Sequence, residues 1–140
     1  MYKRQVFPKL LENRTQDACI RIWVPGCSSG EEVYSLAIGL LEFLAEHHAS
    51  QIPIKLFGTD VSAGAIGKAR AAKYPATILQ DVSPERLQRF FLKNDDVYQV
   101  RKDIRDLCIF AKQDATRDPP FASMDLISCR NLMILSLIHI

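Results

Sequence analysis

The stretch "VPGCSSGEE" (residues 24–32) decides how the chain is expected to fold, because it separates two segments of different periodicity. Before it, residues 20–24 ("IRIWV") form a short β-rich apolar run. After it, apolar residues recur at helical spacing. They are Leu36, Ala37, Leu40, Leu41 and Leu44. The pattern predicts a strand, a glycine-containing turn and a helix, an arrangement that often holds a nucleotide.

The start of this helix carries two serines and two adjacent glutamates. Ser28 or Ser29 is predicted to cap the helix, with Glu31 or Glu32 as the reciprocal partner. Two further helix starts are predicted downstream, one capped by Ser62 and one by Ser83 with a proline in its first turn.

Composition predicts one globular domain. The chain has 140 residues, 48% of them apolar, and a net charge of +2 from 18 basic and 16 acidic residues, which is too balanced to indicate nucleic-acid binding. No apolar run approaches the length of a membrane span, and no signal peptide is recognised, so membrane insertion is not expected. Cys19, Cys27, Cys108 and Cys129 have no C-x-x-C spacing, which favours free thiols in a reducing cytoplasm over a metal site.

Apolar strand-like runs alternate with helical segments along the chain. This alternation predicts an α/β fold with a doubly wound parallel sheet. The predicted core strands are residues 20–24, 54–58, 107–111 and 124–129. Other predicted elements are helices at 8–15, 63–74 and from residue 84, and a strand at 97–104.

Polar residues end the predicted strands, and ligands of such sheets bind at the carboxyl ends of the strands. Asp60 could accept hydrogen bonds from both hydroxyls of a ribose, or could simply stabilise the start of the next helix. Asp114 could accept a bond from an exocyclic amine, or could be a turn acid. Arg130 and Asn131 follow the fourth strand.

The chemistry of the first loop distinguishes between ligands. Its G-x-x-x-G spacing, Gly26 to Gly30, matches neither G-x-G-x-x-G nor a Walker loop. Glu31 and Glu32 would repel a pyrophosphate and attract a cation. A ligand with adenosine at one end and an ammonium and a sulfonium at the other, S-adenosylmethionine, fits these requirements. The alternative is that both glutamates only cap their helix, and the sequence does not decide which one would meet the ligand.

Several motifs together resemble the CheR-type chemotaxis methyltransferases, over about residues 6–135. They are "RIWVPGCSSGEEVYSLAIGL", "FGTDVS", "SPERLQRFF", "VRKDIRDLCIFAKQDATRDPPF" and "MDLISCRNLMI". The resemblance implies a class I methyltransferase (Rossmann-like) sheet of which the first four core strands are present, with a small inserted β-subdomain at about residues 75–105. Residues 136–140 do not resemble the family.

The resemblance also implies a set of residues that bind S-adenosylmethionine. The loop would lie under the methionine part, with Glu31 nearest and Glu32 second. Asp60 would hold the ribose, Asp114 and Ala115 would flank the adenine, and Arg130 and Asn131 would close the pocket. The full set is Gly26, Cys27, Ser28, Gly30, Glu31, Glu32, Asp60, Val61, Asp114, Ala115, Arg130 and Asn131. The family usually has asparagine where this chain has Asp114.

The function implied is methyl transfer to glutamate side chains of chemoreceptor cytoplasmic helices or another signalling protein, in the cytoplasm. The acceptor is already ionised at pH 7, so no catalytic base is expected. The 140 residues alone are expected to be inactive and to self-associate through residues 124–138. Alternatives are a non-catalytic module that senses S-adenosylmethionine or docks a partner, and a methyltransferase for a different small molecule.

Overall fold

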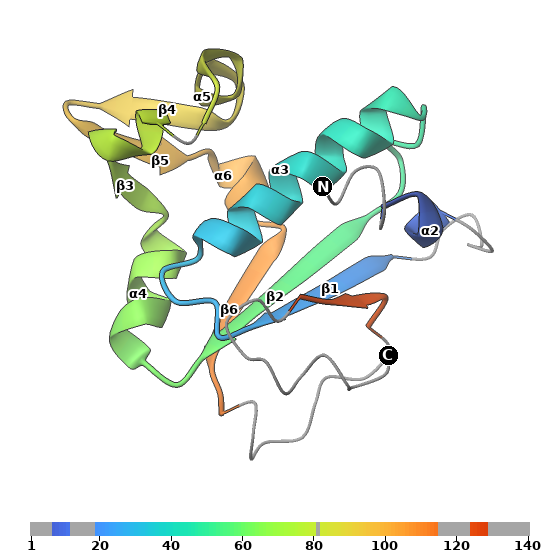
Figure 1. Cartoon of the computed structure of the whole chain (residues 1–140), viewed down its shortest axis with the longest axis horizontal. Helices are drawn as coiled ribbons and strands as arrows, with labels where there is room; N and C mark the ends of the chain where they lie inside the picture. The colour runs from blue at the N-terminus through green and yellow to red at the C-terminus, as the bar shows by residue number, and fades with distance from the viewer. Residues whose placement is uncertain (1–6, 12–18, 81, 115–123, 129–140) are drawn as a thin grey trace.

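A computed structural model describes residues 7–11, 19–80, 82–114 and 124–128 of the chain (Figure 1). Its central element is a parallel sheet with strand order β6-β2-β1-β7. The strands are β1 (Ile20–Pro25), β2 (Ile54–Asp60), β6 (Cys108–Lys112) and β7 (Leu126–Ile127). The four predicted core strands and their parallel arrangement are confirmed, with the described ends within two residues of those predicted.

Helices α3 (Glu31–Glu46) and α4 (Ala63–Ala71) connect the parallel strands and pack against β2 and β6. The predicted apolar face of α3 is buried, except that Leu41 is half-buried. Helix α2 (Phe7–Leu11) covers α3 through Phe7, whose ring centroid lies 5.7 Å from that of Phe43. The rest of the helix predicted at 8–15 lies outside the described residues. No helix in the described ranges is long and apolar enough to cross a membrane.

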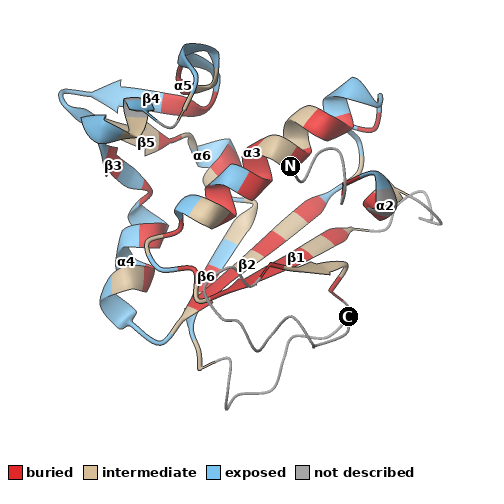
Figure 2. Cartoon of the chain, viewed as in Figure 1, coloured by how far each residue is buried: buried red, intermediate tan, exposed pale blue. Residues whose placement is uncertain are grey.

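The core lies where the sheet meets α3, as the concentration of buried residues in Figure 2 shows. β1 and β2 are in register from Ile20 opposite Ile54 to Pro25 opposite Thr59. The one indole N–H of the chain, in Trp23, donates to the Thr59 hydroxyl at 2.9 Å. Both residues are buried, and this bond pairs a buried donor with a buried acceptor. It also holds the carboxyl ends of β1 and β2 together.

A small antiparallel sheet with order β3-β5-β4 lies beside the parallel one (Figure 1). This small sheet and its helices agree with the predicted inserted β-subdomain. Its strands are β3 (Lys73–Pro75), β4 (Phe91–Asn94) and β5 (Val97–Val100), and the helices around it are η1 (Ala76–Gln80), α5 (Pro84–Phe90) and α6 (Lys102–Arg105).

Two element boundaries predicted in this region are wrong. The helix predicted at 63–74 ends at Ala71, because Ala72 takes a left-handed conformation with φ 55° and the next residues pair with β5 as β3. The strand predicted at 97–104 ends at Val100, where the backbone turns into α6. In the first case long-range pairing with β5, which local periodicity does not encode, sets the boundary.

The three helix starts show two kinds of cap. Ser62 accepts a hydrogen bond from the backbone N–H of Ala65 at 3.1 Å, and Ser83 accepts one from Arg86 at 3.3 Å, which confirms the caps predicted for α4 and α5. The cap predicted for α3 is wrong. Its N-cap is Gly30 with φ 91°, and no side chain caps the helix.

Burial of four weak acids makes the fold sensitive to alkali. Burial raises the pKa of Tyr34 and Tyr74, and it raises that of Cys108 from 9.0 to about 12. Burial, aided by the nearby Asp60 carboxylate, raises the pKa of Cys27 to about 12. Above pH 9 the unfolded chain therefore releases protons that the folded chain keeps, so the free energy of unfolding falls as pH rises.

We expect urea unfolding to give a constant free energy up to about pH 8 and a decline between pH 9 and 11, since ordinary cysteine and tyrosine pKa values lie near 8.5–10. Tyr74→Phe removes one of the four groups and should make the decline shallower. A free energy of unfolding that does not change from pH 8 to pH 10.5 would contradict this account.

Candidate functional site

The carboxyl ends of β1 and β2 meet at the loop of residues 26–30. The backbone N–H of Cys27 donates to the carbonyl oxygen of Thr59 at 2.9 Å, which continues the pairing of the two strands into the loop. Gly30 closes the loop by donating its N–H to the carbonyl of Cys27 at 3.0 Å. The loop is therefore a tight turn of backbone held against the end of β2.

Asp60, the last residue of β2, is the anchor of this loop. Its Oδ2 accepts the N–H of Ser28 at 2.9 Å, and its Oδ1 accepts the N–H of Ser62 at 2.9 Å. An ionised carboxylate offers about four lone-pair positions, so two remain after these bonds. Of the two roles considered from sequence, the structure shows that Asp60 stabilises the start of α4, and its role toward a ribose stays a prediction.

Backbone conformation in the loop explains its glycines. Gly26 and Gly30 have φ of 65° and 91°, and Ser28 between them has φ 54°. At Gly30 a Cβ atom would lie 2.9 Å from the Cβ of Ala69 on α4. The helix packs this closely against the loop because residue 30 has no side chain.

Glu31 and Glu32 take different directions from the start of α3. Glu31 is exposed and accepts a hydrogen bond from the hydroxyl of Ser29. Glu32 is half-buried and accepts one from the hydroxyl of Ser128, just after β7, at 3.4 Å. Neither forms the reciprocal cap. Both carboxyl groups lie beside a loop whose sequence, residues 24–32, contains no lysine or arginine.

The residues predicted at the other strand ends are partly described. The N–H of Gln113, just after β6, donates to the carbonyl of Asp60 at 2.9 Å, which brings the half-buried Asp114 to the same edge of the sheet as Asp60. Val61 lies next to Asp60 and is 60% exposed. Ala115, Arg130 and Asn131 lie outside the described residues.

A hollow of about 270 Å³ opens beside Glu31 and Glu32. It lies between the first turns of α3 and the small subdomain, and it does not include Asp60. Its lining is Glu31, Glu32, Tyr34, Ser35, Ile38, Tyr74, Ile78, Val82, Arg86 and Phe91. The loop and this hollow therefore share the two glutamates.

Tyr74 connects the small sheet to the loop and was not identified from the sequence. Its hydroxyl donates to the carbonyl oxygen of Ser29 at 2.9 Å, from 45 residues further along the chain. The ring packs edge-on against Tyr34, with ring centroids 6.4 Å apart. The sequence near Tyr74 reads as the end of a helix, so nothing local indicates this long-range contact.

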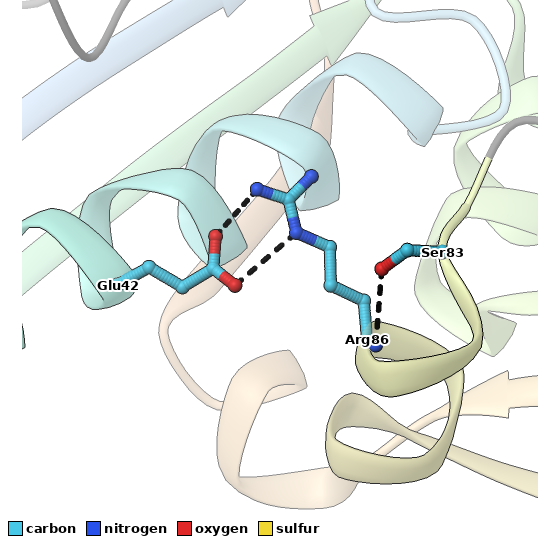
Figure 3. A network of polar contacts seen from close by, with 3 residues as sticks. All are labelled: Glu42, Ser83 and Arg86. Atoms are coloured by element: carbon cyan, nitrogen blue, oxygen red, sulfur yellow. Dashed lines mark hydrogen bonds and ion pairs between the residues drawn. The ribbon is translucent and has the colours of Figure 1, made fainter.

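An ion pair joins the small subdomain to α3 (Figure 3). The guanidinium of Arg86 on α5 donates from Nη2 and Nε to the two carboxylate oxygens of Glu42 at 2.6 and 3.1 Å. Glu42 is mostly shielded, with 16% of its side chain exposed, whereas the Arg86 side chain is 43% exposed. The two-pronged geometry fixes α5 over the hollow.

We expect a double-mutant cycle with Glu42→Gln and Arg86→Gln to give a coupling free energy of about 1 kcal/mol, at the upper end for partly exposed pairs. The matched control is Lys102 with Asp106, an exposed pair within α6 and its cap at 2.9 Å, where about 0.3–0.5 kcal/mol is expected. Both couplings should shrink in high salt. Equal couplings for the two pairs would show that the Arg86–Glu42 pair does not hold the subdomain.

Comparison with known proteins agrees with this geometry. The family model "CheR methyltransferase, SAM binding domain" matches residues 1–136. An uncharacterized 104.1 kDa protein of Rhodobacter capsulatus is 37% identical over 93% of the chain, which covers 14% of that protein. Chemotaxis protein methyltransferases of Borreliella burgdorferi and Escherichia coli are 35% and 30% identical over 93% and 91% of the chain.

The chain spans about half the length of these chemotaxis methyltransferases, 47% and 46%. The family model nevertheless covers almost all of the chain, and the domain that it describes binds S-adenosylmethionine, here abbreviated SAM. The chain therefore belongs to the CheR methyltransferase family, in its SAM-binding domain.

Proposed function

We propose that the protein transfers a methyl group from S-adenosylmethionine to glutamate side chains of chemoreceptors, giving glutamyl methyl esters. The observation that carries this proposal is the Asp60 carboxylate, held by the N–H groups of Ser28 and Ser62 at the end of β2 with acceptor positions left over. The relatives named chemotaxis protein methyltransferase support the same function.

The described residues suit S-adenosylmethionine at each part of the molecule. Asp60 would accept the ribose hydroxyls, and the exposed Val61 would lie against the adenine. The backbone from Gly26 to Gly30 would support the methionine part, and Glu31 or Glu32 would face its positive charges. A pyrophosphate does not fit, because the loop has two carboxylates beside it and no cationic side chain.

Four further residues belong to the proposed site. Asp114, at the edge of the sheet shared with Asp60, is proposed to accept the adenine amine, next to Ala115. Arg130 and Asn131 are proposed to close the pocket near the reacting methyl. These last three residues lie outside the described ranges, so their roles remain proposals from the sequence.

The reaction would need alignment more than acid–base chemistry. When bound, S-adenosylmethionine supplies a methyl group on a positively charged sulfur. The acceptor carboxylate, with a reference pKa near 4.3, is ionised at pH 7 and needs no base. Its oxygen forms the new bond to the methyl carbon while the carbon–sulfur bond breaks, and the electron pair stays on sulfur in S-adenosylhomocysteine. The protein's part is to hold the two reactants in line and exclude water, which can contribute about 7–11 kcal/mol.

The test uses the full-length protein that carries this chain, with S-adenosylmethionine labelled in the methyl group and membranes containing chemoreceptors. We expect label in the receptor that alkali releases as methanol, the signature of a methyl ester. Replacing the receptor's modified glutamates by alanine should abolish labelling. Binding of S-adenosylmethionine by calorimetry without transfer to any receptor would overturn the enzyme proposal in favour of a sensing or docking module.

We also propose, for the location and assembly of the protein, the cytoplasm and self-association through residues 124–138. Cys27 and Cys108 form no disulfide in the described structure, which suits a reducing compartment. β7 pairs with β1 and has no strand on its other side among the described residues, and such an edge can pair with another chain. Residues 129–138 lie outside the described ranges. Sedimentation of the 140-residue chain as a monomer at tens of micromolar would count against self-association.

A further inference from the structure

A second hollow, which shares Tyr34 with the first, lies between α4, α6 and β6. Its volume is about 320 Å³, within the size range of small-molecule pockets. Its lining is Tyr34, Arg70, Arg105, Cys108, Ile109 and Phe110. None of these residues other than Tyr34 lines the hollow beside the glutamates.

The charge of this second hollow is positive. Arg70 and Arg105 are its charged residues, and no carboxylate among the described residues lines it. The nearest acids along the chain are occupied elsewhere: Asp103 accepts the N–H of Ile104, and Asp106 pairs with Lys102 at 2.9 Å. Two guanidinium groups without a carboxylate between them are suited to bind an oxyanion.

Arg105 lines this hollow, and its guanidinium has no acceptor among the described residues. Its Nε is buried and has no hydrogen-bond partner in the described structure, and no ion pair or ring contact engages its guanidinium there. The Nε atoms of Arg21 and Arg101 are also buried and unpaired, but those groups have other contacts, with the Phe57 ring and the Gln88 carbonyl respectively. Because this Nε is buried, it is out of reach of the hollow, and the donors that Arg105 can offer a ligand there are its terminal nitrogens.

The backbone carbonyls at the end of α4 already accept hydrogen bonds from groups other than Arg70 and Arg105. The carbonyl of Ala69 accepts the Tyr34 hydroxyl at 2.7 Å, and that of Ala71 accepts the Gln99 amide at 3.0 Å. The helix carbonyls that would otherwise attract a guanidinium thus have other donors. The positive charge of Arg70 and Arg105 remains available to a ligand.

The edge of β6 limits what that ligand can be. Leu56 donates its N–H to the carbonyl of Leu107, and Gln113 donates its N–H to the carbonyl of Asp60, so the backbone groups of odd-numbered residues of β6 point to β2. The backbone groups of Phe110 therefore point away from β2, although its side chain is buried. Arg70 Nη2 donates to the outward carbonyl of Phe110 at 2.8 Å. That bond occupies the position an added strand would need, and it argues for a small molecule rather than an extended peptide.

The remaining walls are apolar. Ile109 is 42% exposed although it lies in a core strand, and the rings of Tyr34 and Phe110 lie 5.6 Å apart at the back of the hollow. We propose that this second hollow binds a small organic acid, with its carboxylate or phosphate between Arg70 and Arg105 and its apolar part on Ile109 and Phe110. This site is separate from the proposed cofactor site.

The test is calorimetric titration of the full-length protein at low salt with three probes: hexanoate, acetate and inorganic phosphate. We expect hexanoate to bind more tightly than acetate, because only hexanoate has an apolar part to cover Ile109. If phosphate binds as tightly as hexanoate, the oxyanion alone determines affinity, and the apolar half of the proposal is wrong.

Substitutions of the two arginines test whether hexanoate binds in the second hollow. Arg105→Gln and Arg70→Gln should each weaken hexanoate binding about tenfold or more, the loss expected for a charged hydrogen bond. Arg89→Gln is the matched control: it removes the same charge from an exposed residue that stacks on Phe90, and it should leave affinity unchanged. S-adenosylmethionine binding should be unchanged in all three variants, which separates failure here from failure of the proposed function.

Two results would overturn the proposal. One is absence of saturable hexanoate binding to the unsubstituted protein. The other is an equal loss of binding in the Arg105 and Arg89 variants, which would indicate a general effect of net charge. A variant that unfolds is recognised by its loss of S-adenosylmethionine binding. In that case Arg105→Lys, which keeps the charge but loses the planar donor set, serves as the second variant and should bind hexanoate more weakly.

Discussion

Asp60→Ala is expected to weaken S-adenosylmethionine binding by about 1–3 kcal/mol, or roughly five- to 150-fold, the range for lost hydrogen bonds to a charged group. Two effects act together. The variant removes the acceptor proposed for the ribose hydroxyls, and it frees the N–H groups of Ser28 and Ser62, which Asp60 now holds at 2.9 Å each. The loop and the start of α4 would both lose their anchor.

Asp60→Asn separates these effects. An asparagine oxygen can still accept one backbone N–H, so the loop should be better preserved, while the amide cannot accept at both positions as a carboxylate does. We expect its affinity to fall between those of Asp60→Ala and the unsubstituted protein. Asp96→Ala, which removes an exposed acid at the tip of the β4–β5 hairpin, is the control and should bind normally. Unchanged affinity in Asp60→Ala would remove Asp60 from the cofactor site.

Gly30→Ala is expected to destabilise the fold by about 2–4 kcal/mol and to disturb the loop. The backbone at Gly30 has φ 91°, which an alanine adopts at a cost, and the new Cβ would lie 2.9 Å from the Cβ and 3.2 Å from the Cα of Ala69. The nearest atoms belong to the packed helix α4 rather than to a flexible side-chain end. Either the loop or the helix must therefore move.

Gly67→Ala is the matched control for this variant. Gly67 lies in the exposed part of α4, and a Cβ there would meet nothing within 4 Å. Because alanine favours a helix more than glycine does, this variant should stabilise the protein by up to about 1 kcal/mol. Urea unfolding measures both variants. A Gly30→Ala variant as stable as the unsubstituted protein would show that the close contact with Ala69 relaxes freely.

The sequence predicts the four parallel strands because each is a short apolar run between turn signals, and it predicts Asp60 because an acid follows such a run. It does not predict the α3 cap correctly. A serine before a pair of glutamates suggests a side-chain cap, but the close approach of Ala69 requires glycine at the N-cap, and that contact comes from α4, far along the chain.

In the candidate site, too, the sequence predicts local features but not long-range contacts. Asp60 and the loop of residues 26–30 are identified from local pattern, whereas the bonds that shape the loop come from distant residues. Ser128 reaches Glu32 from 96 positions away, and Tyr74 reaches Ser29 from 45. Hydroxyls such as these occur throughout any sequence, and only the folded chain shows which carbonyl or carboxylate each one meets.

The Tyr74 hydroxyl has a consequence for protein engineering. The carbonyl that it binds belongs to Ser29, inside the loop, while Tyr74 itself belongs to β3 of the small sheet. Grafting residues 24–32 onto another methyltransferase sheet would transfer the amino-acid sequence of the loop without the hydrogen bond from Tyr74. A graft that also carries β3 and its tyrosine should reproduce the loop's shape, so the transferable unit is the loop together with the inserted strand.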